Sequence, residues 1–524
     1  MHRREFIKDS LTGGSLLISG AWLSGCASIQ STGRRPTIPG GFASGDVEAS
    51  SAVLWSRASE PARLWVELST RPDRAIAETF KGGIASPANG LNAHAYLQHL
   101  LPGTQYYYSL RLQSLENPAV YGASVHGSFK TAANTAETIR FCWSGDTAGQ
   151  GYGIDPARGG MLTYAAMLQR KPDFFVHCGD LIYADNPMSA EVELDDGSVW
   201  RNDLVEAKTK VAETIEEFRE NFYYNYRDEH VRAFHAEVPV IQQWDDHEVV
   251  NNWYPGEQLI DDDRYTLKDV DTLASHAKTA FFNCNPMRPH DTDPRRIYRK
   301  IERGPLLDLF VIDLRSYRGP NTYNHQSETG KDTAFFGSDQ LAWLKRSLRE
   351  STATWKIICS DMPIGVVIAE WGKEIYEAAA NGENGLPLGR ELELAELFRY
   401  IAREEITNTH FITADVHYCA SHYYNPAKAS FKDFKPFWEF VSGPLHAGSF
   451  GPNPLDGTFG PELKFCGIPA DMEPFRPPSE GYQFFGEMEI DGATQALTVR
   501  HFNRAGEELW KHEIQAERAL ESSG

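Results

Sequence analysis

The sequence predicts an α/β domain preceded by a small β-sandwich, and two patterns support this assignment. From about Glu137, short apolar strand-like runs alternate with longer stretches of helical apolar spacing, which is typical of a sheet with helices on its faces. Between about Gly41 and Thr131 the chain instead contains only short strand-like runs and turn signals, as in a sandwich. A chain of 524 residues has room for two or three domains.

The expected sandwich domain covers residues 38–132. Strand-like runs occupy residues 52–57, 64–68 and 106–112. Residues 100–108 resemble the turn into a late strand of fibronectin-like sandwiches. Residues 132–136 form the expected linker to the second domain.

The expected catalytic domain covers residues 137–515. Length and apolar spacing predict helices over residues 160–171, 207–237, 267–282, 338–349 and 390–405. The domain ends in three predicted strands, at residues 484–490, 496–502 and 508–514, which are joined by hairpin turns. We expect these strands to complete the sheets of the catalytic domain.

The first 30 residues have the features of an export signal. Residues 3–8 resemble the twin-arginine motif, and the weakly apolar stretch 11–23 is too short and polar for a stable membrane span. Residues 23–26 resemble a lipobox, which predicts cleavage before Cys26 and its lipidation. We expect the twin-arginine translocation machinery to export the folded, metal-loaded protein. A lipid on Cys26 would then anchor it to a membrane in the periplasm or at the cell surface. The alternative is a soluble cytoplasmic protein.

The composition restricts the partners. Hydrophobic residues make up 41% and aromatic residues 12%, which is sufficient for packed cores. The formal net charge of −21 disfavours nucleic acid or an anionic membrane as a partner through bulk attraction. Bound multivalent cations would reverse the sign locally, so an anionic substrate remains compatible with this charge.

Five strand-like runs end in aspartate at their C-terminal edge, at residues 139–146, 174–180, 240–247, 355–361 and 411–417. Ligands of open α/β sheets bind where such strand ends gather. A lone aspartate at a strand end is usually a turn former, but several on one edge would repel each other without cations. The pattern therefore predicts a multi-metal hydrolase site. Its candidate ligands are Asp146, Asp180, Tyr183, Asp246, Asp361, Asp415 and His417.

Residues 179–185 resemble the Gly-Asp-Leu-x-Tyr-Ala-Asp motif of purple acid phosphatases. This resemblance implies that Asp180 bridges two metals and that Tyr183 binds Fe(3+) as a phenolate. It implies an iron site made of Asp146, Asp180, Tyr183 and His417. The second site would be made of Asp180, Asp246, Asp361 and Asp415. Because aspartates stand where an asparagine and two histidines usually ligate, this all-oxygen site suits Ca(2+) better than Zn(2+).

The wider sequence resembles the alkaline phosphatase D (PhoD) family over nearly everything after the signal. The similar segments are residues 41–46, 244–248, 313–318 and 439–444. The resemblance implies a metallophosphoesterase catalytic domain, a four-layer αββα sandwich. It also implies an exported phosphomonoesterase or phosphodiesterase that uses iron with one or two calcium ions. Many members have a Ser-Cys pair after the first catalytic strand, whereas this chain has Ser144-Gly145-Asp146.

The same resemblance implies attack on a phosphate ester by a metal-bound hydroxide at alkaline pH, without a covalent intermediate. His247, next to Asp246, is the expected acid for the leaving group, and Glu248 or Asp245 would orient its imidazole. Two groups of residues keep a structural alternative. The arginines would either neutralise phosphate or form buried ion pairs, and the asparagines would either contact ligands or cap a helix: Arg315, Arg318, Arg390, Asn251 and Asn252.

Three functions are compatible with these features. The leading one is an anchored phosphoesterase acting on soluble mono- or diesters. The second is a phospholipase D-like diesterase, because a lipid anchor would hold the site near bilayers. The third is a calcium-stabilised binding protein on an inactive phosphatase scaffold.

Overall fold

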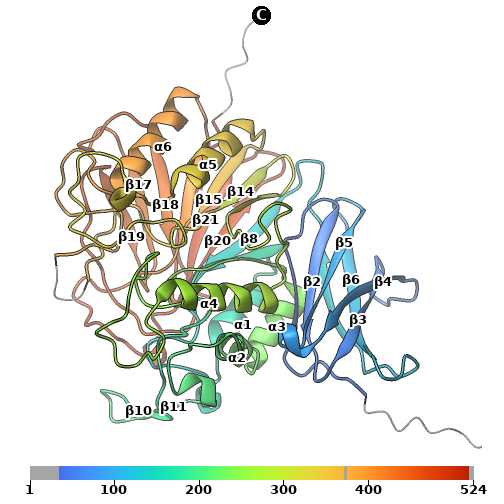
Figure 1. The fold of residues 1–524 in the computed structure, drawn as a ribbon. Helices are drawn as coiled ribbons and strands as arrows, with labels where there is room; N and C mark the ends of the chain where they lie inside the picture. The colour runs from blue at the N-terminus through green and yellow to red at the C-terminus, as the bar shows by residue number, and fades with distance from the viewer. Residues whose placement is uncertain (1–34, 371–373, 518–524) are drawn as a thin grey trace, which may run out of the picture.

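The computed structural model describes residues 35–370 and 374–517 (Figure 1). The predicted export motifs and Cys26 lie outside these residues. In the part of the chain that is described, no helix has the length and apolar character required to cross a membrane.

The N-terminal part is a β-sandwich, as predicted. A four-stranded sheet of order β4-β3-β6-β7 faces strands β1, β2 and β5. Alternate side chains of both layers, such as Leu54, Leu64 and Tyr108, form one buried core. The strands are β1 Phe42–Gly45, β2 Ser51–Arg57, β3 Ala62–Ser69, β4 Glu78–Ala85, β5 Asn92–Gln98, β6 Gln105–Ser114 and β7 Val125–Lys130.

The sandwich shares a sheet with the catalytic part. Strands β1, β2 and β5 end a nine-stranded sheet of order β22-β21-β20-β8-β9-β12-β1-β2-β5. The junction is a parallel pairing of β1 with β12, Gly45 opposite Val240. Next to it, Arg299 forms an ion pair with Asp46 at 2.7 Å. This backbone pairing and the ion pair beside it join the sandwich to the catalytic sheet.

The catalytic part contains two large sheets. The remaining strands of the nine-stranded sheet are β8 Ile139–Ser144, β9 Phe174–Cys178, β12 Val240–Gln243, β20 Phe484–Ile490, β21 Leu497–Asn503 and β22 Glu508–Ile514. A seven-stranded sheet has the order β13-β14-β15-β16-β18-β17-β19. Its strands are β13 Arg299–Glu302, β14 Leu307–Val311, β15 Trp355–Cys359, β16 Thr409–Thr413, β17 Ala420–Tyr424, β18 Phe437–Val441 and β19 Pro461–Cys466. A separate hairpin pairs β10 Glu191–Glu193 with β11 Val199–Arg201.

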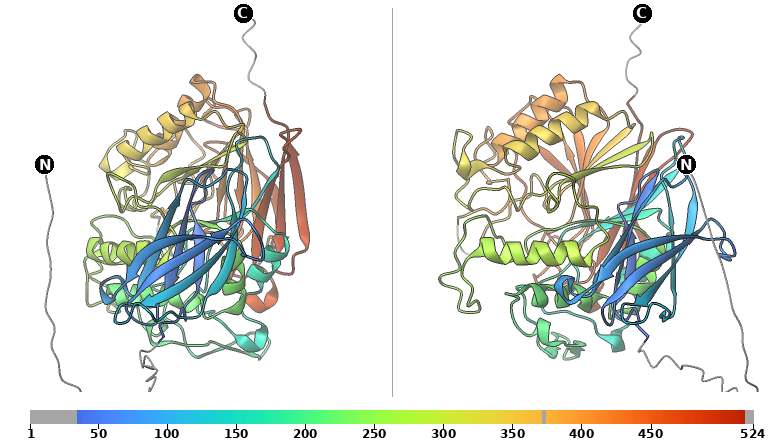
Figure 2. Two further views of the ribbon diagram at one scale, coloured as in Figure 1. Left: turned by 90° about the vertical axis from the view of Figure 1, so that its right-hand side faces the viewer. Right: turned by 45° about the vertical axis from the view of Figure 1, so that its right-hand side comes forward.

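Helices cover the outer faces of both sheets (Figure 2). They are α1 Leu162–Gln169, α2 Ile215–Asn225, α3 Glu229–Glu237, α4 Val270–Cys284, α5 Ser338–Glu350 and α6 Glu391–Arg403. Helices α1–α4 pack on the nine-stranded sheet through Phe175 and Val240, and α5 and α6 pack on the other sheet through Ile358. Alternate strand residues, including Val176 and Ile357, fill the space between the sheets. This arrangement confirms the four-layer αββα fold.

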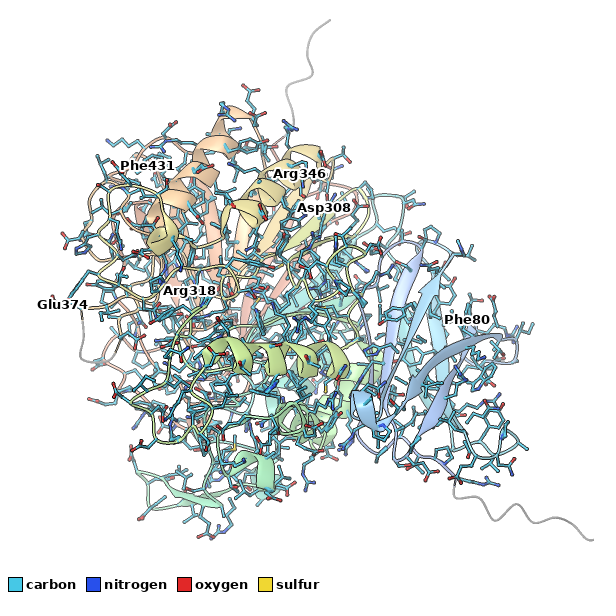
Figure 3. All side chains as sticks on the ribbon, viewed as in Figure 1. Phe80, Asp308, Arg318, Arg346, Glu374 and Phe431 are labelled. Carbon is cyan, nitrogen blue, oxygen red and sulfur yellow. The ribbon has the colours of Figure 1, made fainter. Side chains whose placement is uncertain are left out.

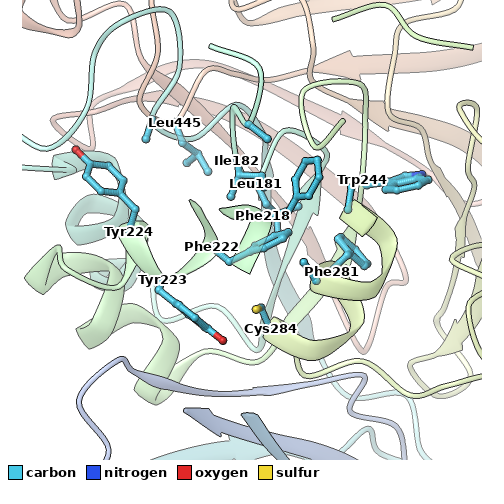
Figure 4. Close-up of a cluster of buried hydrophobic side chains, with 14 of the residues drawn as sticks. Leu181, Ile182, Phe218, Phe222, Tyr223, Tyr224, Trp244, Phe281, Cys284 and Leu445 are labelled. Carbon is cyan, nitrogen blue, oxygen red and sulfur yellow. The ribbon is translucent and has the colours of Figure 1, made fainter. Parts of the chain in front are cut away.

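The core beneath α2 and α4 supports the loops that follow the nine-stranded sheet. Figure 4 shows Phe218 and Phe222 of α2 among the buried side chains that also include Trp244 and Phe281. Trp244 directly precedes the predicted acids 245 and 246. Its indole donates a 3.0 Å hydrogen bond to Asp313, a residue that follows the other sheet. Packing and this bond therefore fix the start of the acidic loop.

The prediction of a single helix over residues 207–237 was wrong, because two separate helices, α2 and α3, lie in this stretch. Helix α2 begins at a capping box between Thr214 and Glu217. The chain turns after Asn225, and Asp228 caps α3 by accepting the N–H groups of His230 and Val231. The aspartate side chain thus replaces the backbone partners that a continuous helix would supply.

Candidate metal centre

The predicted ligands gather where the carboxyl ends of the two sheets face each other. One ligand atom from each of Asp146, Asp180 and His417 lies within 4.8 Å of the others. The same limit defines a second group, Asp180, Asp246 and His247, and a third, Asp245, Asp246 and Asp415. Asp180 belongs to two groups and Asp246 to two. The three groups therefore form one continuous cluster.

The backbone turns sharply at several of these positions. Asp146, Asp180, Asp415 and His417 have positive φ angles of 65°, 54°, 72° and 59°. The left-handed conformation is sparsely populated by non-glycine residues and costs of order 1–3 kcal/mol at each site. Such conformations concentrate at functional sites, because a strand that ended in a relaxed turn would aim its side chain elsewhere.

Asp361 follows β15 but belongs to none of the three groups. Its Oδ2 accepts the N–H of Leu314 at 2.9 Å. Burial first, and then the charge of Asp245, raise the pKa of Asp361 well above its usual range. The structure thus places Asp361 at the edge of the cluster, near Asp245, with one carboxylate oxygen committed to the backbone.

Buried carboxylate oxygens without partners make the cluster suitable for cations. Both side-chain oxygens of Asp146, Oδ2 of Asp245 and Oδ1 of Asp361 have no hydrogen-bond partner among the described residues. Burial, together with neighbouring carboxylates, raises the pKa of Asp146, Asp180 and Asp415 well above the usual range. Buried charges require partners, and a multivalent cation supplies one and lowers these pKa values again. The donor set therefore fits hard metal ions.

His417 and Tyr183 add a nitrogen and a phenol oxygen to the first group. The Tyr183 hydroxyl lies 2.7 Å from Nε2 of His417. Nδ1 of His417 lies 2.5 Å from the carbonyl oxygen of Gly448, which directs Nε2 toward the cluster. Burial lowers the pKa of His417 to about 4, so the imidazole is neutral, as a metal ligand must be.

His247 is paired with Asp185. Its Nδ1 lies 2.7 Å from Oδ1 of Asp185, and its ring stacks on Tyr183 with centroids 4.3 Å apart. Burial alone would lower the pKa of His247, but the carboxylates of Asp185 and Asp246 outweigh it and raise the pKa to about 9. The prediction that Glu248 or Asp245 orients this imidazole was therefore wrong.

Glu248 and Asp245 have other partners. The carboxylate of Glu248 accepts the N–H groups of Leu181 at 2.5 Å and Asp245 at 2.8 Å. It therefore ties the loop after β9 to the loop after β12. Asp245 accepts a 2.5 Å hydrogen bond from Nε of Arg315.

Arg315 and Arg318 form buried ion pairs, which was the structural alternative for them. Arg315 pairs with Asp245 and contacts Glu377, and Arg318 lies 3.3 Å from the same Glu377. Figure 3 shows Arg318 in the catalytic part, on the opposite side of the view from Phe80 of the sandwich. Arg390 donates to backbone carbonyls, including that of Pro320 at 2.7 Å. These contacts hold the acidic loops and leave phosphate binding by the arginines unsupported.

The backbone N–H groups of both asparagines bind acids at the site, and Nδ2 of Asn252 lies 3.4 Å from Glu370. The N–H of Asn252 donates to Oδ2 of Asp246 at 2.5 Å, and the N–H of Asn251 donates to Oδ2 of Asp185 at 2.8 Å. Two roles were not predicted from the sequence. Asp185 is the partner of His247, and Asp245 is a member of the cluster. Asp185 ends the 179–185 motif, and that position was the available signal.

Comparisons with known proteins agree with this geometry. A family model described as PhoD-like phosphatase matches residues 141–501, and the model for the N-terminal domain of the same family matches residues 25–133. The chain belongs to the PhoD-like phosphatase family. It is accordingly a phosphoric ester hydrolase similar to alkaline phosphatase D.

Individual relatives show the extent of the similarity in sequence and fold. The chain is 25% identical to alkaline phosphatase D of Bacillus subtilis (strain 168) over 482 residues, which cover 86% of this chain and 77% of the relative. A solved structure of PhoD superposes with a TM-score of 0.66 at 18% identity, covering 92% of each chain. The purple acid phosphatase PPD1 from yellow lupin (Lupinus luteus) has a TM-score of 0.54 at 13% identity. Its alignment covers 92% of this chain and 74% of that one. Both structures share the fold.

We expect Asp185→Asn to lower kcat by about 10- to 100-fold, because partners that orient a site residue contribute about that much. The amide keeps the shape but removes the charge that favours a protonated His247. Steady-state kinetics on an aryl phosphate and elemental analysis check this. Asp73→Asn, on the exposed surface of the sandwich, is the control. Loss of bound metal in Asp185→Asn would instead indicate a structural role.

We expect Gly443→Ala to lower metal content. A Cβ at Gly443 would lie far inside van der Waals distance of Oδ2 of Asp146, so the carboxylate must move. Overpacking of this kind costs about 1–3 kcal/mol. Gly330→Ala is the matched control, because its Cβ would enter open space. Equal metal content in the two variants, measured by mass spectrometry, would contradict the expectation.

Proposed function

We propose that the protein is an exported, metal-dependent phosphoesterase that hydrolyses phosphate mono- or diesters at alkaline pH. The observation that carries the proposal is the shared Asp180, which joins the group containing His417 to the group containing Asp246 and His247. A carboxylate common to two groups suits a pair of cations separated by one bridging residue. The imidazole of His247 belongs to the second group, next to Asp246.

The proposed iron ligands are Asp146, Asp180, Tyr183 and His417, and the proposed calcium ligands are Asp180, Asp246, Asp361 and Asp415. The unpartnered oxygens of Asp146 and Asp361 support this division, as does the neutral imidazole of His417. Oxygen-only donors favour one or two Ca(2+) ions over Zn(2+) at the second site. When bound, the metals supply Lewis acidity that activates water and neutralises charge on the phosphoryl oxygens.

The residues of the chain supply the remaining steps. The carboxylates of Asp185 and Asp246 favour the protonated imidazole of His247 and raise its pKa to about 9. Asp185 holds Nδ1, so Nε2 is the atom that donates a proton to the leaving oxygen. Stacking on Tyr183 restricts the ring. Burial of His247, Asp185 and Tyr183 keeps bulk water from competing with these bonds.

Elemental analysis and a three-substrate assay test the proposal together. Protein purified without added metal should contain iron and calcium, and it should hydrolyse a soluble aryl phosphate or its bis-ester. Zinc in place of both metals would refute the proposed ligand division. Hydrolysis confined to a phosphatidylcholine suspension would favour the phospholipase alternative. Lack of hydrolysis with intact metal content would favour a binding protein.

Export and anchoring are proposed from the N-terminal motifs alone. Twin-arginine export of the folded protein would be followed by lipidation of Cys26, leaving it in the periplasm or at the cell surface. Cys26→Ser should move the protein from the membrane fraction to the soluble fraction after cell lysis. A membrane-bound Cys26→Ser variant would contradict the lipid anchor.

A further inference from the structure

A line of three rings leads from the metal cluster to the surface. Phe450 packs edge-on against His417 with ring centroids 5.1 Å apart. Phe475 packs edge-on against Phe450 with centroids 4.7 Å apart. His417 and Phe475 mark the two ends of this line, because His417 is buried whereas 49% of Phe475 is exposed. We call His417, Phe450 and Phe475 the aromatic ladder.

The backbone of Phe475, the outer residue of the aromatic ladder, has an unfavourable conformation. Phe475 has a φ of 64°, in the left-handed region where a bulky residue is an outlier. The neighbouring residue is firmly anchored: Arg476 exchanges backbone hydrogen bonds of 2.9 and 3.1 Å with Ser449, and its guanidinium pairs with Asp195 at 2.6 Å. The exposure of Phe475 is therefore built into the fold, and the packing contacts of the described residues leave about half of this residue uncovered.

We infer that Phe450 and Phe475 form a subsite for a planar aromatic group of the phosphate ester. This inference rests on the proposed function, because it assigns the phosphoryl group to the metal cluster. An ester whose phosphorus lies beside His417 extends its organic group along the aromatic ladder. Exposed ring faces and edges bind another aromatic ring by offset or edge-on packing. The shared chemistry is a flat π-surface, which aryl groups and nucleobases both present.

The charges around the ladder fit this class of ligand. Arg476 at its outer end is already paired with Asp195 and lies 3.4 Å from Glu480, so its charge is compensated. The subsite therefore recognises its ligand by ring packing. Attraction of a second anionic group of the ester to Arg476 is not its main source of selectivity. Small alkyl esters fill the phosphoryl position but cannot reach Phe475.

Substrate selectivity of ring variants tests the inference. We expect Phe475→Ala to lower kcat/KM for 1-naphthyl phosphate about fivefold more than for glycerol phosphate, since an aromatic pair contributes roughly that factor. Phe475→Trp should retain the preference. Tyr96→Ala is the control, because Tyr96 is 50% exposed on the distant sandwich. Comparing each variant with wild type on the same ester removes differences in intrinsic reactivity.

Two further measurements keep the test decisive. Binding of 1-naphthylphosphonate, followed by its fluorescence anisotropy, should weaken by a similar factor in Phe475→Ala. If that variant does not fold, Phe475→Leu replaces it. The same variant is assayed on a nucleoside monophosphate. If Phe475→Ala lowers kcat/KM for this ester as much as for the naphthyl ester, nucleobases are ligands of the subsite. If kcat/KM for it is unchanged, the ligands are aryl groups.

If Phe475→Ala lowered kcat/KM for a short-chain lipid phosphate as much as for the naphthyl ester, the inference would be overturned, because any apolar group would then bind the subsite. An unchanged naphthyl-to-glycerol ratio in Phe475→Ala would overturn it as well, while leaving the proposed function intact. A wild-type protein that hydrolyses none of these esters would instead refute the proposed function.

Discussion

Asp180→Asn is expected to reduce kcat/KM for phosphate esters by at least about a thousandfold. Asp180 is the carboxylate shared by two groups of candidate ligands, and an amide cannot supply its charge. Lewis-acid stabilisation of a phosphoryl transfer is worth several kcal/mol, and each 1.36 kcal/mol is about tenfold in rate. Steady-state assays and metal analysis of the purified variant measure the two consequences together.

A stability measurement separates this explanation from simple misfolding. Burial, followed by the charges of Asp246 and Asp245, raises the pKa of Asp180 well above its usual range when no cation is bound. At Asp180, folded metal-free protein thus holds a proton that the unfolded chain releases near pH 4, so the contribution of this group to stability decreases as pH rises above that value. Metal-free Asp180→Asn should melt at a higher temperature than metal-free wild type at neutral pH.

The exposed Asp433, which pairs with Arg399, provides the control for this effect. Asp433→Asn should change neither activity nor melting temperature beyond measurement error. A metal-free Asp180→Asn protein that is less stable than metal-free wild type would contradict the electrostatic argument, even if its activity were lost.

His247→Gln is expected to lower kcat by about 10²- to 10⁴-fold for alkyl esters, the contribution typical of a positioned acid. The loss should be much smaller for a nitrophenyl ester, because a good leaving group departs without protonation. Glutamine cannot replace the imidazolium that Asp185 and Asp246 stabilise. Kinetics across a series of leaving groups give the slope of log kcat against the pKa of the leaving group, which should be steeper for the variant than for wild type.

Metal content distinguishes an acid from a ligand at this position. Both roles are compatible with the geometry, since His247 also belongs to the group of Asp180 and Asp246. The acid role requires that His247→Gln retain its metals. His126→Gln, on strand β7 of the sandwich, controls for loss of a histidine. Equal losses for all leaving groups, accompanied by loss of metal, would assign His247 to the ligands instead.

Much of the fold was predictable because local patterns report burial. The apolar runs at residues 139–144, 174–178 and 355–359 coincide with β8, β9 and β15. Strand sequences of this kind remain apolar on both faces because helices cover one side and another sheet the other. The break between α2 and α3 was not predicted, because an aspartate such as Asp228 can lie within a helix or cap one. Its capping contacts with His230 and Val231 form only once the chain turns there.

The family resemblance of the site was also readable from the chain, since the motif at residues 179–185 and the acids after each strand are local features. Local features predicted that Asp146, Asp180 and Asp246 would converge, because strand ends of a layered α/β fold share an edge. The cluster that joins Asp180 to the acids on both sides agrees with this expectation.

By itself, the sequence indicated many of the strands and the acids that end five of them, and hence the kind of chemistry at the sheet edge. Only the tertiary structure decided that Asp185 pairs with His247 across 62 residues, that β1 joins the sandwich to β12, and that Phe475 continues the line of rings from His417. The physical reason is that periodicity encodes which side of a strand is buried. Contacts between distant segments depend instead on sheet order and loop packing, which no local pattern contains.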